Sequence, residues 1–179
     1  YLMDLSAKLA DLQNRSSRHR EVLLTEEAAK TALVLPFIQA LGYDVFNPSE
    51  VVPEFTCDVG TKKGEKVDYA VFRDGKVSIL LECKPISVAL NVNHASQLFR
   101  YFTVTDARLG ILTNGLVYQF YSDIEQPNKM DDKPFFTFSL EAIKPTDARI
   151  IEHFTRGAFD IDAILLEAAG LKLQLQLRQ

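Results

Sequence analysis

Three charged residues near the middle of the chain have types and a spacing that suit metal-dependent hydrolysis. Asp68 precedes the triplet Glu82-Cys83-Lys84. Two carboxylates a few ångströms apart form the kind of hard-oxygen pocket that Mg²⁺ prefers. A lysine on the same strand could orient an attacking water or help to deprotonate it. Such a set suits hydrolysis of a phosphodiester, which needs charge neutralisation at the phosphoryl group and an activated water.

The two carboxylates meet only if the hairpin between strands expected at 67–73 and 76–84 has the right turn. A two-residue turn at Asp74-Gly75 would mix apolar and polar side chains on both faces, which a half-buried sheet resists. A three-residue loop that also includes Arg73, with Gly75 in the left-handed conformation, separates the two kinds. The apolar pattern therefore predicts the longer loop, which places both carboxylates and the lysine on one polar face.

An ordinary explanation competes with the catalytic one. Glu-x-Lys on an edge strand is common, and it usually marks a solvated salt bridge on an exposed face. Asp68 favours the catalytic explanation, because it interrupts an otherwise apolar strand between Val67 and Tyr69 and lowers the strand propensity there. Strand pairing also brings it near a second acidic position. We therefore interpret these residues as a metal-dependent hydrolytic site.

The elements around this hairpin predict an α/β domain with a central mixed sheet. Apolar periodicity predicts helices at 3–17, 26–41 and 92–105, and strands at 51–56, 67–73, 76–84, 109–113 and 116–122. Thr25 is the expected N-cap of the second helix and Gly42 its end. Pro36 should kink this helix or reset its last turn. Asn114-Gly115 predicts a tight turn between the last two strands.

The remainder of the chain is expected to add elements to this core. A strand is predicted at 135–140, and helices are predicted near 147–155 and 160–169. Leucines alternate from Leu171 to Leu177, a pattern typical of a strand that also fits a tail or a junction to another domain. The expected organisation is an N-terminal helix, an α/β domain and a C-terminal helical extension, at 1–20, 21–145 and 146–179.

Composition limits the functional classes. The chain has 179 residues, of which 47% are hydrophobic and 25% charged, and its net charge is −4. This charge argues against a DNA-coating protein, but not against an enzyme that gathers carboxylates around metal ions. No apolar run approaches the ~20 residues that span a bilayer. Two cysteines in dissimilar contexts fit a reducing cytoplasm. The chain starts at Tyr1 rather than Met, so we expect it to be a portion of something longer.

The ordered segments resemble a known group of enzymes. Asp68 and the later Glu82-Cys83-Lys84 triplet are similar to the PD-(D/E)XK nuclease superfamily. The stretch 25–122 more closely resembles the N-terminal nuclease domain of type I restriction enzyme R subunits and their stand-alone relatives. The similar segments, in order, are TEEAAKTALVLPFIQALGYD, VDYAVF, ILLECK, ASQLFRYF and LGILTNGLVYQFY. The resemblance covers just over half the chain and implies a restriction-endonuclease-like core of order α-β-β-β-α-β-β, with extra C-terminal helices.

The resemblance also implies a metal site. Asp68 and Glu82 would ligate Mg²⁺, which Mn²⁺ can replace, and the backbone carbonyl of Cys83 would be a further ligand. Glu26 matches the acidic residue of the family's first helix and would hold a water or a second metal ion. It is preferred to Glu27 because of its distance from the following proline. Acidic residues in a first helical turn are also favoured by the helix dipole, so a structural role is equally well supported.

The remaining correspondences concern the attacking water and the family's further domains. Lys84 would position or activate the water, and Gln97 matches the glutamine that supports the lysine in such enzymes. The chain departs from the family pattern at Ala29-Lys30, where Thr-Arg is frequent. No Gly-x-x-x-x-Gly-Lys-Ser/Thr motif occurs in the sequence, so we do not expect the chain to translocate DNA by itself.

The leading hypothesis is therefore a Mg²⁺-dependent endonuclease domain that acts on DNA in a restriction or defence system. The expected partners are DNA and other subunits of a restriction-modification complex, and no membrane is expected. One alternative is a nuclease-fold module that lacks catalysis and serves binding or assembly. Another is a repair or recombination nuclease with the same core. Lys62, Lys63 and Lys66 could contact phosphates, but a solvated loop explains them as well.

Overall fold

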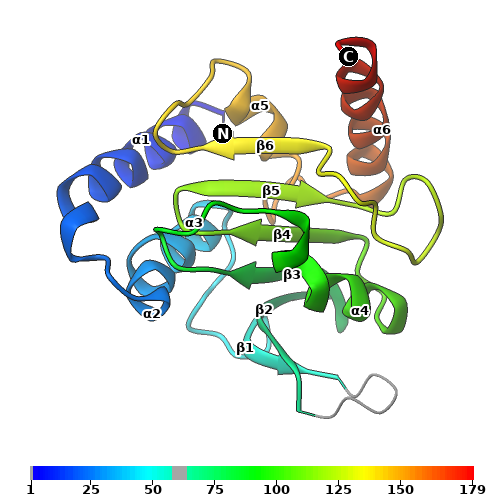
Figure 1. Cartoon of the computed structure of the whole chain (residues 1–179), viewed down its shortest axis with the longest axis horizontal. Helices are drawn as coiled ribbons and strands as arrows, with labels where there is room; N and C mark the ends of the chain where they lie inside the picture. The colour runs from blue at the N-terminus through cyan, green and yellow to red at the C-terminus, as the bar shows by residue number, and fades with distance from the viewer. Residues whose placement is uncertain (1, 58–63) are drawn as a thin grey trace.

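The computed structural model describes residues 2–57 and 64–179 (Figure 1). Within these residues, six strands form one mixed sheet in the order β1-β2-β3-β4-β5-β6. Their bounds are β1 Val51–Thr56, β2 Lys66–Arg73, β3 Lys76–Cys83, β4 Leu109–Thr113, β5 Val117–Tyr121 and β6 Phe136–Ser139. All neighbours are antiparallel except β3 and β4, which are parallel and therefore need a crossover connection. The predicted α/β class with a mixed sheet is confirmed.

Helices cover both faces of the sheet (Figure 1). Their bounds are α1 Leu2–His19, η1 Arg20–Val22, α2 Glu26–Ala29, η2 Lys30–Val34, α3 Leu35–Ala40, η3 Val92–Ala95, α4 Ser96–Val104, α5 Asp147–Glu152 and α6 Ile161–Leu177. The core on one face joins α1, α3, α5 and α6 to the sheet through residues such as Leu9, Phe37 and Ile151. The core on the other face packs α4 against the sheet through Leu98 and Phe102. No helix in the described part of the chain is both long and apolar enough to cross a membrane.

The helix predicted at 26–41 begins and ends as expected but is not uniform. Thr25 is the N-cap, and its hydroxyl accepts the Ala28 N–H at 3.1 Å. Gly42 follows the last turn with a φ of 91°. Between them, η2 is a π-helical segment in which the Leu35 N–H bonds to the Lys30 carbonyl. The interruption lies just before Pro36, whose ring cannot be accommodated by a regular α-helical turn.

The predicted three-residue loop between β2 and β3 is wrong. Arg73 pairs with Lys76, so the turn contains only Asp74 and Gly75, with φ values of 51° and 75°. These positive values match the tight hairpin turn that Asp-Gly favours. The polar and apolar faces are still separated, because the register shifts between Val71 and Phe72.

This shift is a bulge in β3. Val71 pairs with Ile79 whereas Phe72 pairs with Val77, so Ser78 has no partner of its own. One extra residue reverses the inward and outward alternation of the strand beyond it. Ile79 therefore joins the core under α1 and α3, while Val77 joins the core under α4. The bulge therefore separates the apolar and polar side chains onto opposite faces, which is the effect expected of the longer loop.

The end of the chain also differs from its predicted form. The leucine alternation from 171 to 177 is not a strand, because α6 continues to Leu177. Its buried residues, Ile164 and Ala168, are separated by one helical turn and pack into the same core as the sheet. Contact at this helical spacing overrides the local period-two pattern. The predicted division into 1–20, 21–145 and 146–179 stays a prediction.

Candidate active site

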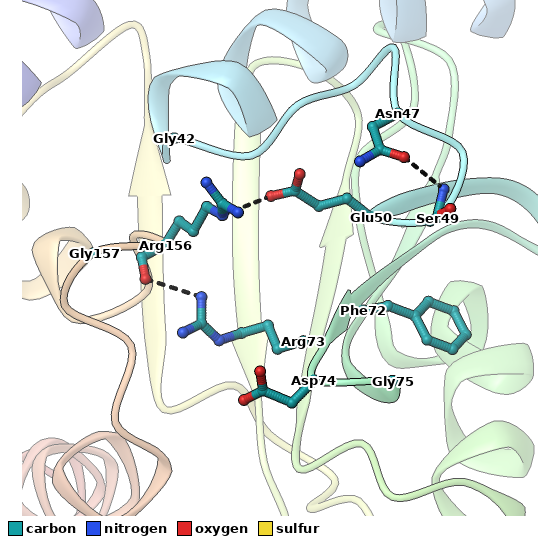
Figure 2. Close-up of a pocket in the computed structure, with 10 residues that line it drawn as sticks. All are labelled: Gly42, Asn47, Ser49, Glu50, Phe72, Arg73, Asp74, Gly75, Arg156 and Gly157. Atoms are coloured by element: carbon teal, nitrogen blue, oxygen red, sulfur yellow. Dashed lines mark hydrogen bonds and ion pairs between the residues drawn. The ribbon is translucent and has the colours of Figure 1, made fainter.

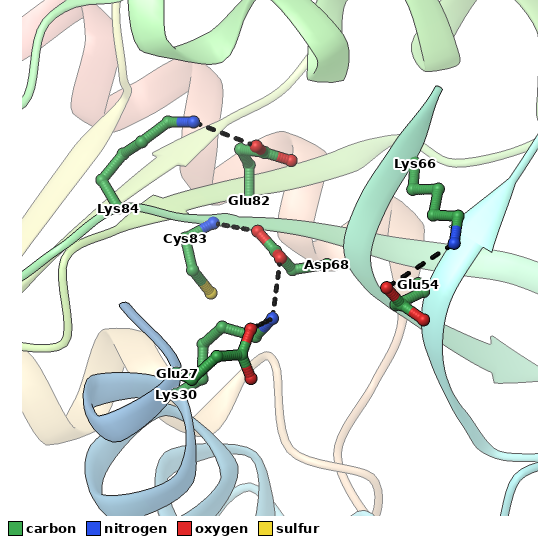
Figure 3. A network of polar contacts seen from close by, with 8 residues as sticks. All are labelled: Glu27, Lys30, Glu54, Lys66, Asp68, Glu82, Cys83 and Lys84. Atoms are coloured by element: carbon green, nitrogen blue, oxygen red, sulfur yellow. Dashed lines mark hydrogen bonds and ion pairs between the residues drawn. The ribbon is translucent and has the colours of Figure 1, made fainter. Parts of the chain in front are cut away.

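The candidate site lies where β2 and β3 diverge, at the end of the hairpin opposite its turn (Figure 3). The last register pair at this end is Tyr69 with Leu81. Asp68 and Glu82 are therefore the next residues of two neighbouring strands. The Asp68 side chain is 15% exposed and the Glu82 side chain 6%. Two carboxylates are thus brought together in a mostly buried environment, as the sequence predicted.

Both carboxylate oxygens of Asp68 have partners. Oδ2 accepts the backbone N–H of Cys83 at 2.7 Å, and Oδ1 accepts a hydrogen bond from Lys30 Nζ at 3.0 Å (Figure 3). The first contact comes from the neighbouring strand and the second from η2. The Cys83 thiol is buried, and burial raises its pKa, so it adds no negative charge to the site. Asp68 is held in one orientation from two sides.

Glu82 is held by Lys84 and by Gln97 of α4. Lys84 Nζ lies 3.2 Å from its Oε1. With its amide nitrogen turned toward Glu82, Gln97 of α4 donates to Oε1 at 2.8 Å, to Oε2 at 3.1 Å and to the Lys66 backbone carbonyl at 3.0 Å. Burial, followed by the charge of Asp68, raises the pKa of Glu82 to about 7. The pair of carboxylates is therefore electrostatically unfavourable without an additional positive charge.

The two glutamates at the start of α2 have different relations to these groups. The carboxyl of Glu26 is partly buried; burial first, and then the charge of Asp68, raises its pKa, while Lys84 and Lys30 lower it. Glu27 is 77% exposed and receives a hydrogen bond from Lys30 at 2.7 Å. The negative charge of Asp68 therefore acts on Glu26, which is the residue chosen from the sequence. Glu27 is connected to Asp68 through the lysine.

Lys30 is the part of this network that the sequence reasoning missed. Its side chain is only 8% exposed and bridges Glu27 and Asp68 (Figure 3). Burial lowers the pKa of Lys30, but its two carboxylate hydrogen bonds outweigh this effect and the pKa lies above its ordinary value. A signal was present in the sequence, since Lys30 occupies the apolar stripe of its helix together with Leu33 and Phe37.

The site has the donors and the charge deficit that a divalent ion requires. Its four carboxylates (Glu26, Glu27, Asp68 and Glu82) face two ammonium groups (Lys30 and Lys84), so full ionisation leaves two negative charges. Oxygen ligands and this residual charge suit Mg²⁺ or Mn²⁺. In the described part of the chain, no three His, Cys, Asp or Glu side chains are already grouped to hold a metal. The ammonium group of Lys30 lies between the carboxylates of Glu27 and Asp68.

Other charged side chains near the site are paired with each other. Arg100 of α4 donates to Glu65 at 2.7 and 2.8 Å. Lys66 lies 3.6 Å from Glu54 (Figure 3). His94 accepts the Asn91 N–H at 3.1 Å and completes a capping box at η3, which is a structural role. Lys62 and Lys63, the other candidate phosphate contacts, lie outside the described residues.

A separate cavity of about 660 Å³ lies beside the turn end of the same hairpin (Figure 2). Arg156 forms an ion pair with Glu50 at 2.9 Å across this cavity. Arg73 donates to the Arg156 carbonyl at 2.9 Å. These contacts connect the β2–β3 turn to the loop after α5, so we interpret the arginines here as structural.

Comparison with known proteins adds one finding. A family model described as "Type I restriction enzyme R protein N terminus (HSDR_N)" matches residues 25–134. Curated proteins and solved structures give no significant match. The matched range begins at the N-cap of α2 and continues beyond β5, so it contains all of the site residues described above. It also spans more than half of the chain, as expected from the sequence resemblance. The chain therefore belongs to the family of type I restriction enzyme R protein N-terminal domains.

Proposed function

We propose that this chain is a Mg²⁺-dependent endonuclease domain that hydrolyses DNA phosphodiester bonds in a restriction system. The observation that carries the proposal is the meeting of Asp68 and Glu82 at the open end of β2 and β3, with Lys84 in contact with Glu82. Membership of a restriction-enzyme family supports it independently. The acting partners would be DNA and other subunits of a restriction-modification complex, in the cytoplasm.

The carboxylates would hold the metal ion. Asp68 and Glu82 would be ligands, with the Cys83 carbonyl and Glu26 as further oxygen donors. The ion would supply charge neutralisation at the scissile phosphate and acidify a bound water. Gln97 and the Cys83 N–H keep the two carboxylates in place through hydrogen bonds. Such supporting contacts are needed because a ligand that is free to rotate binds metal weakly.

Lys84 has the position required to act on the attacking water. Its side chain is 27% exposed, so it extends from the buried strand toward solvent, and its ammonium remains near Glu82. An ammonium there would orient the water and offset negative charge as the phosphoryl group is attacked. Lys30 does not suit this role, because it is more deeply buried and both of its described partners are carboxylates.

Cleavage of supercoiled plasmid tests the proposal. The purified chain should nick or cut the plasmid with Mg²⁺ or Mn²⁺ but not with EDTA, and Asp68→Ala and Lys84→Ala should each abolish cleavage. Lys76→Ala is the matched control, because Lys76 is an exposed lysine at the turn end of β3, whereas Lys84 follows the opposite end of this strand. Cleavage that persists in both site variants would reject the assignment. Metal binding without cleavage would favour the binding or assembly module.

A further inference from the structure

A buried lysine at the centre of a carboxylate group needs a physical reason. Lys30 Nζ lies 2.7 Å from Glu27 Oε1 and 3.0 Å from Asp68 Oδ1, and 5.6 Å from the centre of the Tyr69 ring. Taking an ammonium out of water is costly unless it is paired and hydrogen-bonded. Because Glu27 is largely exposed, the buried partner that compensates Lys30 is Asp68.

The backbone holds Lys30 in this position. It is the first residue of the π-helical segment η2, which follows directly after the turn that carries Glu26 and Glu27. A π-helical turn shifts the direction of side chains relative to a regular helix, and such turns are frequent at functional sites. The opposite end of the segment is fixed by Leu33 and Val34, which are fully buried. Lys30 is therefore part of a rigid element and does not simply lie over the site from solvent.

The charge count gives Lys30 a specific role. When all four carboxylates are ionised, as metal binding favours, they and the two lysines leave a residual charge of two negative units, which one divalent ion neutralises. Without Lys30, three negative charges would remain and one divalent ion would leave the cluster under-neutralised. Lys30 also donates to the Asp68 oxygen that does not face Cys83, so both oxygens of this carboxylate already accept a hydrogen bond.

We propose that Lys30 is a built-in cation that occupies, between Asp68 and Glu27, the place a second divalent ion would take, so that the site binds a single divalent ion. This inference rests on the proposed metal-dependent function and specifies its metal stoichiometry. Lys30 acts through Asp68, and it is therefore a positioning residue. Its role is distinct from that of Lys84, which contacts the other carboxylate and is more exposed.

Calorimetric titration of the whole chain with Mn²⁺ tests the inference. Wild-type protein should bind one ion. Lys30→Met, which keeps the length of the side chain and removes its charge, should bind two. Lys30→Arg should return the stoichiometry to one, which a merely structural role would not produce. Lys8→Met is the matched control, because Lys8 pairs with one exposed carboxylate, Asp4, and should leave the stoichiometry at one.

The outcomes separate this inference from the function on which it rests. Wild-type protein that binds no Mn²⁺ rejects the proposed function. Wild-type protein that binds two ions, or a folded Lys30→Met variant that binds one ion with unchanged affinity, overturns the role of Lys30 and leaves the metal-dependent function standing. If circular dichroism shows that Lys30→Met is unfolded, Lys30→Gln replaces it, and the wild-type stoichiometry alone still decides against a two-ion site.

Discussion

The carboxylate of Asp68 accepts the backbone N–H of Cys83 at 2.7 Å, so a side chain of one strand is bonded to the main chain of the next. Cys83 lies between the second carboxylate and Lys84 in the sequence. This hydrogen bond therefore joins the two parts of the site at the point where the strands separate. A charge-assisted bond of this kind is stronger than a neutral one and fixes geometry as well as energy. A displacement of the Cys83 backbone in β3 would therefore also move the donor that orients the Asp68 carboxylate.

Replacing the supporting glutamine should weaken metal binding more than folding. In Gln97→Ala, Glu82 loses the amide that donates to both of its oxygens. Loss of an outer hydrogen bond to a ligand typically lowers metal affinity about 10–100-fold. Calorimetry with Mn²⁺ would measure the change. Thr103→Ala, on the exposed side of the same helix, is the control and should bind as wild type does. Equal affinity for both variants would contradict the supporting role of Gln97.

Removing the charge of Glu82 should stabilise the metal-free protein. The folded-state pKa of about 7 lies above the usual 4.5, so this carboxyl contributes stability below pH 4.5 and loses it as pH rises through about 7. Glu82→Gln has no such titration, and at pH 8 in EDTA it should be more stable than wild type by about 2 kcal/mol. Urea unfolding at pH 5 and pH 8 would measure this. The prediction is contradicted if the stability difference is the same at both pH values.

Removing the charge of Lys30 should have the opposite effect on stability. In Lys30→Met, Asp68 keeps its negative charge in a mostly buried position but loses its cationic partner. Removal of one partner of a buried ion pair costs about 3 kcal/mol. Urea unfolding in EDTA would measure the loss, with Lys8→Met as a near-neutral control. Because the cost arises from an unneutralised carboxylate, saturating Mn²⁺ should restore most of it. A loss that Mn²⁺ does not restore would point to packing instead.

The hairpin turn gives a test of backbone strain. Gly75 has a φ of 75°, and a Cβ added there would meet no atom within 4 Å, so Gly75→Ala introduces strain without a clash. The expected loss is about 1 kcal/mol. Gly157→Ala is the matched control, because its Cβ would also have open space and its φ is not positive. Thermal unfolding of both variants would show whether the positive φ makes Gly75→Ala less stable than Gly157→Ala. Equal melting temperatures for the two variants would argue against backbone strain at Gly75.

How much of this fold and site the sequence predicts depends on how far apart the interacting residues lie along the chain. The strands, the N-cap at Thr25 and the two facing carboxylates follow from local patterns, since alternation and capping act over a few residues. The hairpin register was predicted with the wrong turn, because a shift inside the strand and a longer loop produce the same alternation near the site. Pattern alone cannot separate two backbones that bury the same residues.

Two further features depended on contacts between distant parts of the chain. From the sequence, Lys30 is a departure from a family pattern and no partner can be assigned to it, because Asp68 belongs to another element and is far away in the sequence. The leucines near the end alternate like a strand, yet the packing of Ile164 and Ala168 favours a helix. In both cases tertiary contact decides: the apolar stripe marks Lys30 as unusual without identifying its partner, and the alternation of the leucines predicts the wrong element.

The bulge at Ser78 makes β3 tolerant of a change in length at one position. Val71 pairs with Ile79 and Phe72 with Val77, so deleting Ser78 would leave both pairs and the two-residue turn unchanged. Ile79 and Val77 would then be consecutive and would still face opposite cores. Deletion of Leu80, by contrast, would turn every later side chain of the strand, including Glu82, to the wrong face. A Ser78 deletion should therefore keep its fold and its site, whereas the Leu80 deletion should lose both, as circular dichroism and Mn²⁺ binding would show.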